Sequence, residues 1–242
     1  MFFCRAANTK LMRKDLMCEY CPLYVAGSKK ATEGSCAYRE NGKEFPDFSD
    51  GNSLLSQALQ FAAEAHKGAF RKGSSVPYIL HPMETAMTTL HMTGDESLAA
   101  AAALHDVIED TPYTYEDIRA RFGEKIADIV LKESENKRRD MTPEESWKIR
   151  KEEGIQRIAG ASREAKIVAL SDKLSNMRAT ARDYREQGDR VFMRFHVKEK
   201  SAHAWYHRGL LDALSELSDT HEYREYQRLH GEVFERLGEG RG

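Results

Sequence analysis

The chain has 242 residues, which is enough for one large domain or for one domain with a small appendage. Hydrophobic residues make up 40% and charged residues 31% of it, and the formal net charge of -2 offers no global basic field for nucleic acid or an anionic membrane. No apolar run approaches the roughly 20 residues of a membrane-spanning helix, and the first residues lack an export signal. We therefore expect a cytoplasmic protein that binds neither nucleic acid nor membrane.

The N-terminal segment differs in composition from the rest of the chain. All the cysteines lie in the first 36 residues, and a polar, turn-rich stretch follows them between residues 41 and 52. This predicts a cysteine-containing extension over residues 1–50 and a separate domain over residues 51–242. Four thiolates are enough for a tetrahedral structural Zn²⁺ site, and free or redox-active thiols are the alternative. The four cysteines are Cys4, Cys18, Cys21 and Cys36.

From Ser53 onward the apolar residues recur at helical spacing, and no alternating strand pattern interrupts them. Ser53 is expected to cap a first helix, and Pro82 is expected at the start of a second that runs to Met92. A third helix, rich in Ala and Leu, is predicted over residues 97–108. Six more are predicted, over residues 114–123, 124–132, 143–158, 162–184, 194–217 and 220–237. The predicted fold is all-α.

The end of the Ala-rich helix carries unusual polar residues. Because residues four apart share a helix face, His105 and Glu109 are expected on one side and Asp106 and Asp110 on the adjoining strip. Unpaired carboxylates beside an apolar helix are costly, and a bound cation compensates their charge. This pattern favours a metal site over a structural role.

Two further segments carry residues suited to the same site. Asp172 and Asn176 lie four apart after an apolar run, and His81 follows a Gly/Ser loop that begins with Arg71 and Lys72. Two imidazoles and two carboxylates form a mixed nitrogen and oxygen site that suits a divalent transition metal such as manganese or iron. The remaining histidines show no matching spacing and are interpreted as surface or packing residues.

Three blocks in this order resemble a known family. The segments His66-Lys67-Gly68 and Pro77-Tyr78-Ile79-Leu80-His81-Pro82 are similar to its first block. The segment His105-Asp106-Val107-Ile108-Glu109-Asp110-Thr111 is similar to its second, and Leu170-Ser171-Asp172-Lys173-Leu174-Ser175-Asn176-Met177-Arg178 to its last. The family is the HD superfamily of metal-dependent phosphohydrolases, and within it the (p)ppGpp hydrolase domain of RelA/SpoT proteins and the stand-alone small alarmone hydrolases.

The resemblance covers residues 53–237 and implies an HD-domain helical bundle. It implies that one Mn²⁺ is held by His81, His105, Asp106 and Asp172. It implies that Glu109 and Asp110 activate water and protonate the leaving group. The substrate contacts that it implies or loosely suggests are Arg71, Lys72, Lys137, Asn176, Arg194 and Lys200.

The reaction implied by the resemblance is removal of pyrophosphate from the ribose 3′ position of (p)ppGpp, the guanosine alarmone of the stringent response. The expected partner is therefore a small nucleotide. One alternative is a phosphohydrolase of the same family that acts on a nucleoside mono- or triphosphate or on NADPH. The other is a non-catalytic sensor that binds a nucleotide through the same fold.

Overall fold

The computed structural model describes residues 53–134, 138 and 140–235, together with the backbone of four short strands nearer the N-terminus. The chain divides into two compact units, Met1–Ser53 and Leu54–Gly242, and each is described by itself. That the cysteine-containing extension and the helical part act as separate domains stays a prediction.

The first unit contains two short antiparallel strand pairs. Strand β1 (Phe2–Cys4) pairs with β2 (Thr9–Leu11), and β3 (Tyr24–Val25) pairs with β4 (Ser35–Cys36). Cys18 and Cys21 lie outside the described residues, and at the other two cysteines only the backbone is described. The predicted zinc site therefore stays a prediction.

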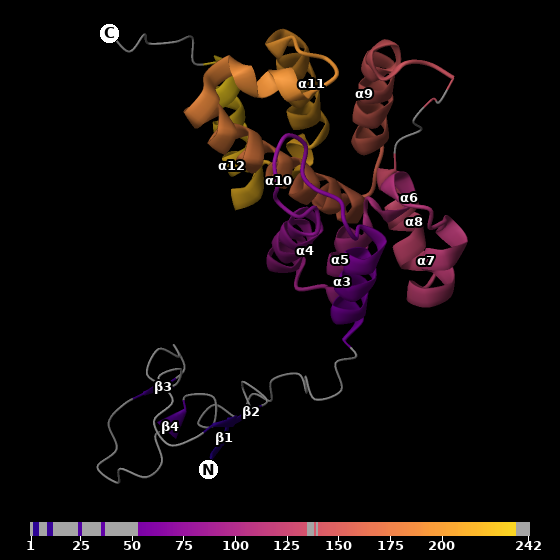
Figure 1. Ribbon diagram of the computed structural model, residues 1–242, viewed down its shortest axis with the longest axis vertical. Coiled ribbons are helices and arrows are strands. Elements are labelled where there is room, and N and C mark those ends of the chain that lie inside the picture. The colour runs from indigo at the N-terminus through magenta and orange to yellow at the C-terminus, as the bar shows by residue number, and fades with distance from the viewer. Residues whose placement is uncertain are drawn as a thin grey trace. The chain divides into compact units, whose positions relative to one another are not determined.

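The second unit is all-α, as predicted, and its first half surrounds an alanine-rich helix (Figure 1). The helices of this half are α3 (Leu54–Ala65), α4 (Leu80–Thr93), α5 (Glu96–Leu104), α6 (Val107–Asp110), α7 (Tyr115–Phe122) and α8 (Glu124–Glu133). Residues 99–103 of α5 are all alanine and all buried, and α5 packs against α3, α4 and α8. Alanine both favours the helix and lets neighbouring helices approach closely.

The second half is built on one long helix. Its elements are α9 (Pro143–Ala159), α10 (Arg163–Gln187), the 3₁₀ segment η3 (Gly188–Arg194), α11 (Lys200–Ala213), the 3₁₀ turn η4 (Ser215–Leu217), α12 (His221–His230) and the π-helical turn η5 (Gly231–Glu235). Helix α10 belongs to both hydrophobic cores, because Val168 packs into the first while Leu170 and Leu174 pack into the second. Burying each of these leucines contributes about 1.5–3 kcal/mol.

Caps encoded in the sequence set where several helices begin. The Thr114 and Asp117 side chains form a capping box at the start of α7, and Thr142 and Glu145 form one at the start of α9. The hydroxyl of Ser162 caps α10 by accepting from the backbone N–H of Ala165. Among the helices of the described residues, none combines the length and apolar character needed to cross a membrane.

Two predicted helices are wrong in extent. The helix expected over residues 97–108 is interrupted between α5 and α6, and the one expected over residues 194–217 is only α11 with a short 3₁₀ turn after it. The backbone is extended at Phe195 and Glu199. The His203 ring bonds to the backbone carbonyl of Val197 at 2.8 Å, so a side chain from α11 stabilises this non-helical connection.

Three histidines lie among aromatic side chains in the second core. The rings of His203 and Phe192 are 5.2 Å apart, and Phe234 lies 5.4 Å from His207 and 5.2 Å from His230. Burial lowers the pKa of all three imidazoles below the ordinary 6.5. The folded protein therefore holds these histidines neutral at a pH where the unfolded chain already takes up protons.

We predict that the free energy of unfolding falls as the pH drops below about 6.5, because the unfolded chain then binds more protons than the folded one. His207→Gln should reduce this dependence, since the residue with the strongly lowered pKa is gone. Denaturant unfolding at several pH values between 5 and 8 measures the slope. The exposed His91 on α4 supplies the control, and His91→Gln should unfold with the wild-type slope. A His207→Gln slope equal to that of the wild type would contradict the prediction.

Candidate functional site

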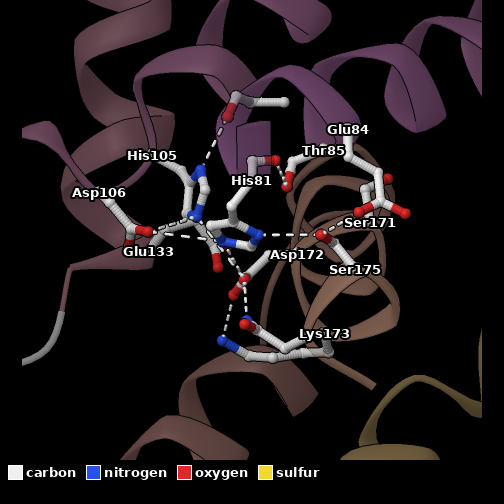
Figure 2. A network of polar contacts seen from close by, with 12 residues as sticks. His81, Glu84, Thr85, His105, Asp106, Glu133, Ser171, Asp172, Lys173 and Ser175 are labelled. Carbon is white, nitrogen blue, oxygen red and sulfur yellow. Dashed lines mark hydrogen bonds and ion pairs between the residues drawn. The ribbon is translucent and has the colours of Figure 1, made fainter. Parts of the chain in front are cut away.

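Four side chains from three separate stretches of the chain meet where α4, α5 and α10 pack together (Figure 2). His81 lies in the first turn of α4, His105 and Asp106 follow the last residue of α5, and Asp172 lies in α10. His81, His105 and Asp172 are buried, and Asp106 is partly exposed. These are the four side chains that the sequence analysis named as metal ligands.

The ring nitrogens and carboxylate oxygens of these residues point at one another. His81 Nε2 lies 3.1 Å from Asp172 Oδ1 and 3.6 Å from Asp106 Oδ2. His105 Nε2 lies 2.9 Å from Asp106 Oδ2 and 3.6 Å from Asp172 Oδ1. Ligand atoms of His81, His105 and Asp106 all fall within 4.8 Å of one another, so the cluster is able to hold a metal ion.

The interruption between α5 and α6 makes this convergence possible. Consecutive residues of a continuous helix project about 100° apart, which would send the His105 and Asp106 side chains in different directions. Here α5 ends at Leu104, and Asp106 has φ -93° and ψ -3°, at the edge of the right-handed helical region and away from regular α-helix values. Both neighbours therefore reach the same centre, in place of the adjoining helix strips expected from the sequence.

The orientation of His105 fits a bound cation. Its Nδ1 bonds to the backbone carbonyl of Ala102 at 2.8 Å, and since a carbonyl only accepts, Nδ1 carries the hydrogen. In the neutral ring the lone pair is therefore on Nε2, which is buried and lies 2.9 Å from Asp106 Oδ2. A lone pair that faces the oxygens of Asp106 and Asp172 is repelled by them, and a divalent cation between them turns this repulsion into shared coordination.

The charges around the centre reinforce this arrangement. Burial alone would lower the pKa of His105, but without a cation the carboxylates of Asp106 and Asp172 outweigh it and hold this pKa well above the ordinary value. Nε2 then carries a second proton, which a bound cation would displace. Burial alone would raise the pKa of Asp172, but Lys173 and the two imidazoles hold it well below the usual range. Burial also opposes the charge of Asp106, but the neighbouring His105 outweighs it and lowers this pKa as well. Both carboxylates are therefore ionised, which is the form that binds a cation.

Asp172 also connects the centre to a basic loop. Asn176 Nδ2 donates to Asp172 Oδ1 at 2.6 Å, and Arg71 Nη2 donates to Asn176 Oδ1 at 2.7 Å. The Arg71 guanidinium lies 5.7 Å from the centre of the Tyr78 ring. Arg71 and Asn176, two of the predicted substrate contacts, are thereby placed beside the four clustered side chains.

The loop that carries Arg71 and Lys72 is closed by a bridge between Phe70 and Pro77. Gly73 in this loop has a φ of +71°, which side chains rarely adopt, and a Cβ there would lie 3.3 Å from Cδ of Arg194. Arg194 therefore packs directly on the loop. Lys72 is exposed at the same loop.

The other predicted site residues are placed as follows. Glu109 and Asp110 lie on α6, one turn beyond the cluster, where Glu109 is partly buried and Asp110 is exposed. The Lys200 ammonium donates to Tyr184 Oη and Asp189 Oδ1, both at 2.8 Å. Lys137 lies outside the described residues. Their roles in binding or catalysis stay predictions.

Two residues at the site were given no role from the sequence. Tyr78 Oη donates to Asp106 Oδ2 at 2.5 Å, and burial together with the Asp106 charge raises the pKa of the phenol. His66 is buried with its ring 4.8 Å from that of Tyr78, and burial lowers its pKa. Both residues lie within the first motif block, so their place in that block was the available signal.

The sequence profile of the HD domain matches residues 58–196, which is more than half of the chain. The guanosine-3′,5′-bis(diphosphate) 3′-pyrophosphohydrolase MESH1 of Xenopus tropicalis is 37% identical over 129 residues, covering 52% of this chain and 69% of the relative. The bifunctional (p)ppGpp synthase/hydrolase SpoT of Escherichia coli K12 is 46% identical over 76 residues, covering 31% of this chain and only 11% of SpoT.

Solved structures show the same fold. A Listeria monocytogenes EGD-e protein superimposes with a TM-score of 0.55 at 30% identity, covering 66% of this chain and 97% of the other. A structure described as a metazoan ortholog of SpoT that hydrolyzes ppGpp superimposes with a TM-score of 0.60 at 24% identity, covering 77% of this chain and 96% of that one. The profile match and the frog relative establish the family, and this chain belongs to the HD domain family.

Proposed function

We propose that this chain is a metal-dependent phosphohydrolase that removes pyrophosphate from the 3′ position of (p)ppGpp. The proposed cofactor is one Mn²⁺, with His81, His105, Asp106 and Asp172 as its ligands. A cytoplasmic location and a small nucleotide as the substrate, with no nucleic acid or membrane bound, belong to the same proposal.

The observation that carries the proposal is the convergence of two imidazoles and two carboxylates, with His105 Nε2 turned toward the carboxylates. Relatives named 3′-pyrophosphohydrolases for guanosine-3′,5′-bis(diphosphate) support the choice of substrate. A divalent cation in such a site lowers the pKa of a coordinated water and polarises a phosphoryl oxygen.

The proton transfers of the reaction are proposed to be carried out by two carboxylates next to the metal site. Glu109 and Asp110, one turn after the cluster, are proposed to orient the attacking water, accept its proton and deliver a proton to the ribose 3′ oxygen as the bond to phosphorus breaks. The water oxygen ends on the pyrophosphate that leaves, and the nucleoside keeps its 5′ phosphates. The buried position of the cluster strengthens these electrostatic interactions because bulk water is excluded.

The basic loop is proposed to hold the substrate phosphates. Arg71 is joined to Asp172 through Asn176, so its guanidinium is held close to where phosphorus would react. Lys72 lies on the same loop, and Arg194 of η3 packs against it with its guanidinium paired to Asp183. A planar guanidinium suits two phosphate oxygens at once. Since the net charge of the chain is -2, this local cluster is needed to attract a polyanion. Lys137 and Lys200 remain proposed contacts of the same kind.

Removing a ligand should remove the metal. Asp106→Ala and His81→Ala should each lose bound manganese after dialysis and lose turnover, because three ligands of a four-ligand site remain and one buried charge or donor is unmatched. Elemental analysis of the dialysed proteins measures the metal directly. Asp128, an exposed carboxylate bonded to Tyr115, supplies the control, and Asp128→Ala should retain manganese. Wild-type activity in either ligand variant would end the proposal.

The same analysis reports zinc independently of manganese. If the cysteines hold a structural Zn²⁺, replacing Cys18 and Cys21 by serine should remove zinc and leave manganese in place. Zinc absent from the wild type would leave free thiols as the remaining interpretation of the extension.

The substrate is tested with a panel of nucleotides in the presence of Mn²⁺. We expect hydrolysis of guanosine-3′,5′-bis(diphosphate) to GDP and pyrophosphate, measured by chromatography of the products. Glu109→Gln and Asp110→Asn should lower kcat by about 100- to 10,000-fold, with bound manganese retained. Equal turnover of nucleotides that lack a 3′ phosphate would favour another nucleotide, and tight binding without turnover would favour a sensor.

Arg71 is expected to act mainly in substrate binding. Arg71→Ala should raise KM for the alarmone about 10- to 100-fold, because a charge-assisted hydrogen bond contributes about 1.5–3 kcal/mol. Steady-state kinetics separates this effect from a change in kcat. Arg119, an exposed arginine paired with Glu116 on α7, supplies the control. Arg119→Ala should keep the wild-type KM. A KM for Arg71→Ala equal to that of Arg119→Ala would contradict the proposed role of Arg71.

A further inference from the structure

His81, one of the proposed ligands, contacts a side chain of another helix on the side of its ring that faces away from the carboxylates. Its Nδ1 lies 2.9 Å from Oγ of Ser175, 94 residues further along the chain (Figure 2). Both residues are almost completely buried, with 3% of His81 and 2% of Ser175 exposed, so no bulk water competes for this contact. The Ser175 hydroxyl therefore faces the ring nitrogen opposite the one that points at the carboxylates.

A serine hydroxyl alone does not decide which ring nitrogen carries the hydrogen, because it can donate or accept. Glu84 removes that ambiguity. The Ser175 hydroxyl donates its one hydrogen to Glu84 Oε2 at 2.7 Å. The Ser175 oxygen is then left to accept from His81 Nδ1–H, and the His81 lone pair is placed on Nε2, 3.1 Å from Asp172 Oδ1.

Glu84 is in turn held as an acceptor by a guanidinium. Arg178 Nη1 donates to the second Glu84 oxygen, Oε1, at 3.0 Å. Arg178 also donates from Nε and Nη2 to the two carboxylate oxygens of Glu225, at 2.9 and 2.6 Å. The chain of contacts thus runs from α12 through α10 to α4, and ends on the ring of His81.

We propose that Glu84 and Ser175 are positioning residues that fix the tautomer and ring orientation of His81, so that its Nε2 is ready to bind the cation. His105 is held by the backbone carbonyl of Ala102, which needs no such help because it only accepts. The two imidazoles therefore reach the same tautomer by different means. This inference rests on the proposed function, since it assigns His81 to the metal.

Substitution of Ser175 and substitution of Glu84 should act differently on the tautomer of His81. Ser175→Ala leaves His81 Nδ1 without a partner, so both tautomers should be populated. Glu84→Gln offers one acceptor oxygen in place of two. Because the Arg178 guanidinium attracts that oxygen, the amide NH₂ faces Ser175, whose hydroxyl then donates to His81 Nδ1. The expected tautomer in Glu84→Gln is therefore Nε2–H, with the lone pair turned away from the site.

The test is ¹⁵N NMR of the histidine rings in the metal-free protein, followed by titration with Mn²⁺ alone. The His81 signals are assigned by their loss in His81→Gln. We expect an Nδ1–H tautomer in the wild type, the altered tautomers above in the variants, and a dissociation constant for Mn²⁺ raised about 10- to 100-fold in each variant. Bound Mn²⁺ is read from the electron paramagnetic resonance signal of the free ion.

Ser171 provides the matched control. It is a fully buried serine one turn earlier in α10, and its hydroxyl donates to the backbone carbonyl of Ile167 at 2.9 Å. Ser171→Ala therefore removes the same group from the same helix without touching His81, and it should keep the wild-type tautomer and Mn²⁺ affinity. Wild-type tautomers and affinities in both Ser175→Ala and Glu84→Gln would overturn the inference. Failure of the wild-type protein to bind Mn²⁺ would instead end the proposed function. The tautomers of the metal-free proteins would still test whether Glu84 and Ser175 orient His81.

Discussion

The structure depends on one electrostatic constraint, which is the gathering of two carboxylates and two imidazole nitrogens in a buried volume. Asp172 and the two histidines are buried. His81 Nε2 lies 3.1 Å from Asp172 Oδ1, and His105 Nε2 lies 2.9 Å from Asp106 Oδ2. Such a group of lone pairs is stable only when positive charge is shared among them. Lys173, which donates to Asp172 Oδ2 at 2.5 Å, supplies part of that charge from one side. The remaining side is where a cation fits.

The helical scaffold meets this constraint by fixing three of the four clustered side chains through hydrogen bonds from outside the cluster. The Ala102 carbonyl holds His105, the Ser175 hydroxyl holds His81, and Tyr78 holds Asp106. These three hydrogen bonds come from different parts of the chain, so the three side chains are oriented independently of one another. Outer contacts of this kind set ring orientation and ligand basicity in metal sites generally.

The sequence predicted the fold class and the four clustered residues well, because both depend on local signals. Helical periodicity, capping boxes and the spacing within each motif are visible over a few residues. The interruption at His105 and Asp106 was missed because the Ala-rich run before them favours a continuous helix. What breaks it is tertiary, since Asp106 turns toward His81 of α4 and His105 toward Asp172 of α10.

The residues that contact the clustered side chains from outside the cluster were missed for the same reason. Ser175 and Glu84 are separated by 91 residues, and nothing in either local sequence marks them as partners of a ligand. Tyr78 and His66 lie inside a quoted motif, but only the fold shows their contact with each other and with the site. Residues 135–137, which include Lys137, lie outside the described residues, so the part of the prediction that concerns them is unchanged.

The most direct test of the central claim is a crystal structure of the manganese-loaded protein with anomalous diffraction recorded on both sides of the manganese absorption edge. The account predicts one anomalous peak within coordination distance of His81 Nε2, His105 Nε2, Asp106 and Asp172. A peak elsewhere in the helical unit, or no peak in a protein that hydrolyses its substrate at full rate, would contradict it.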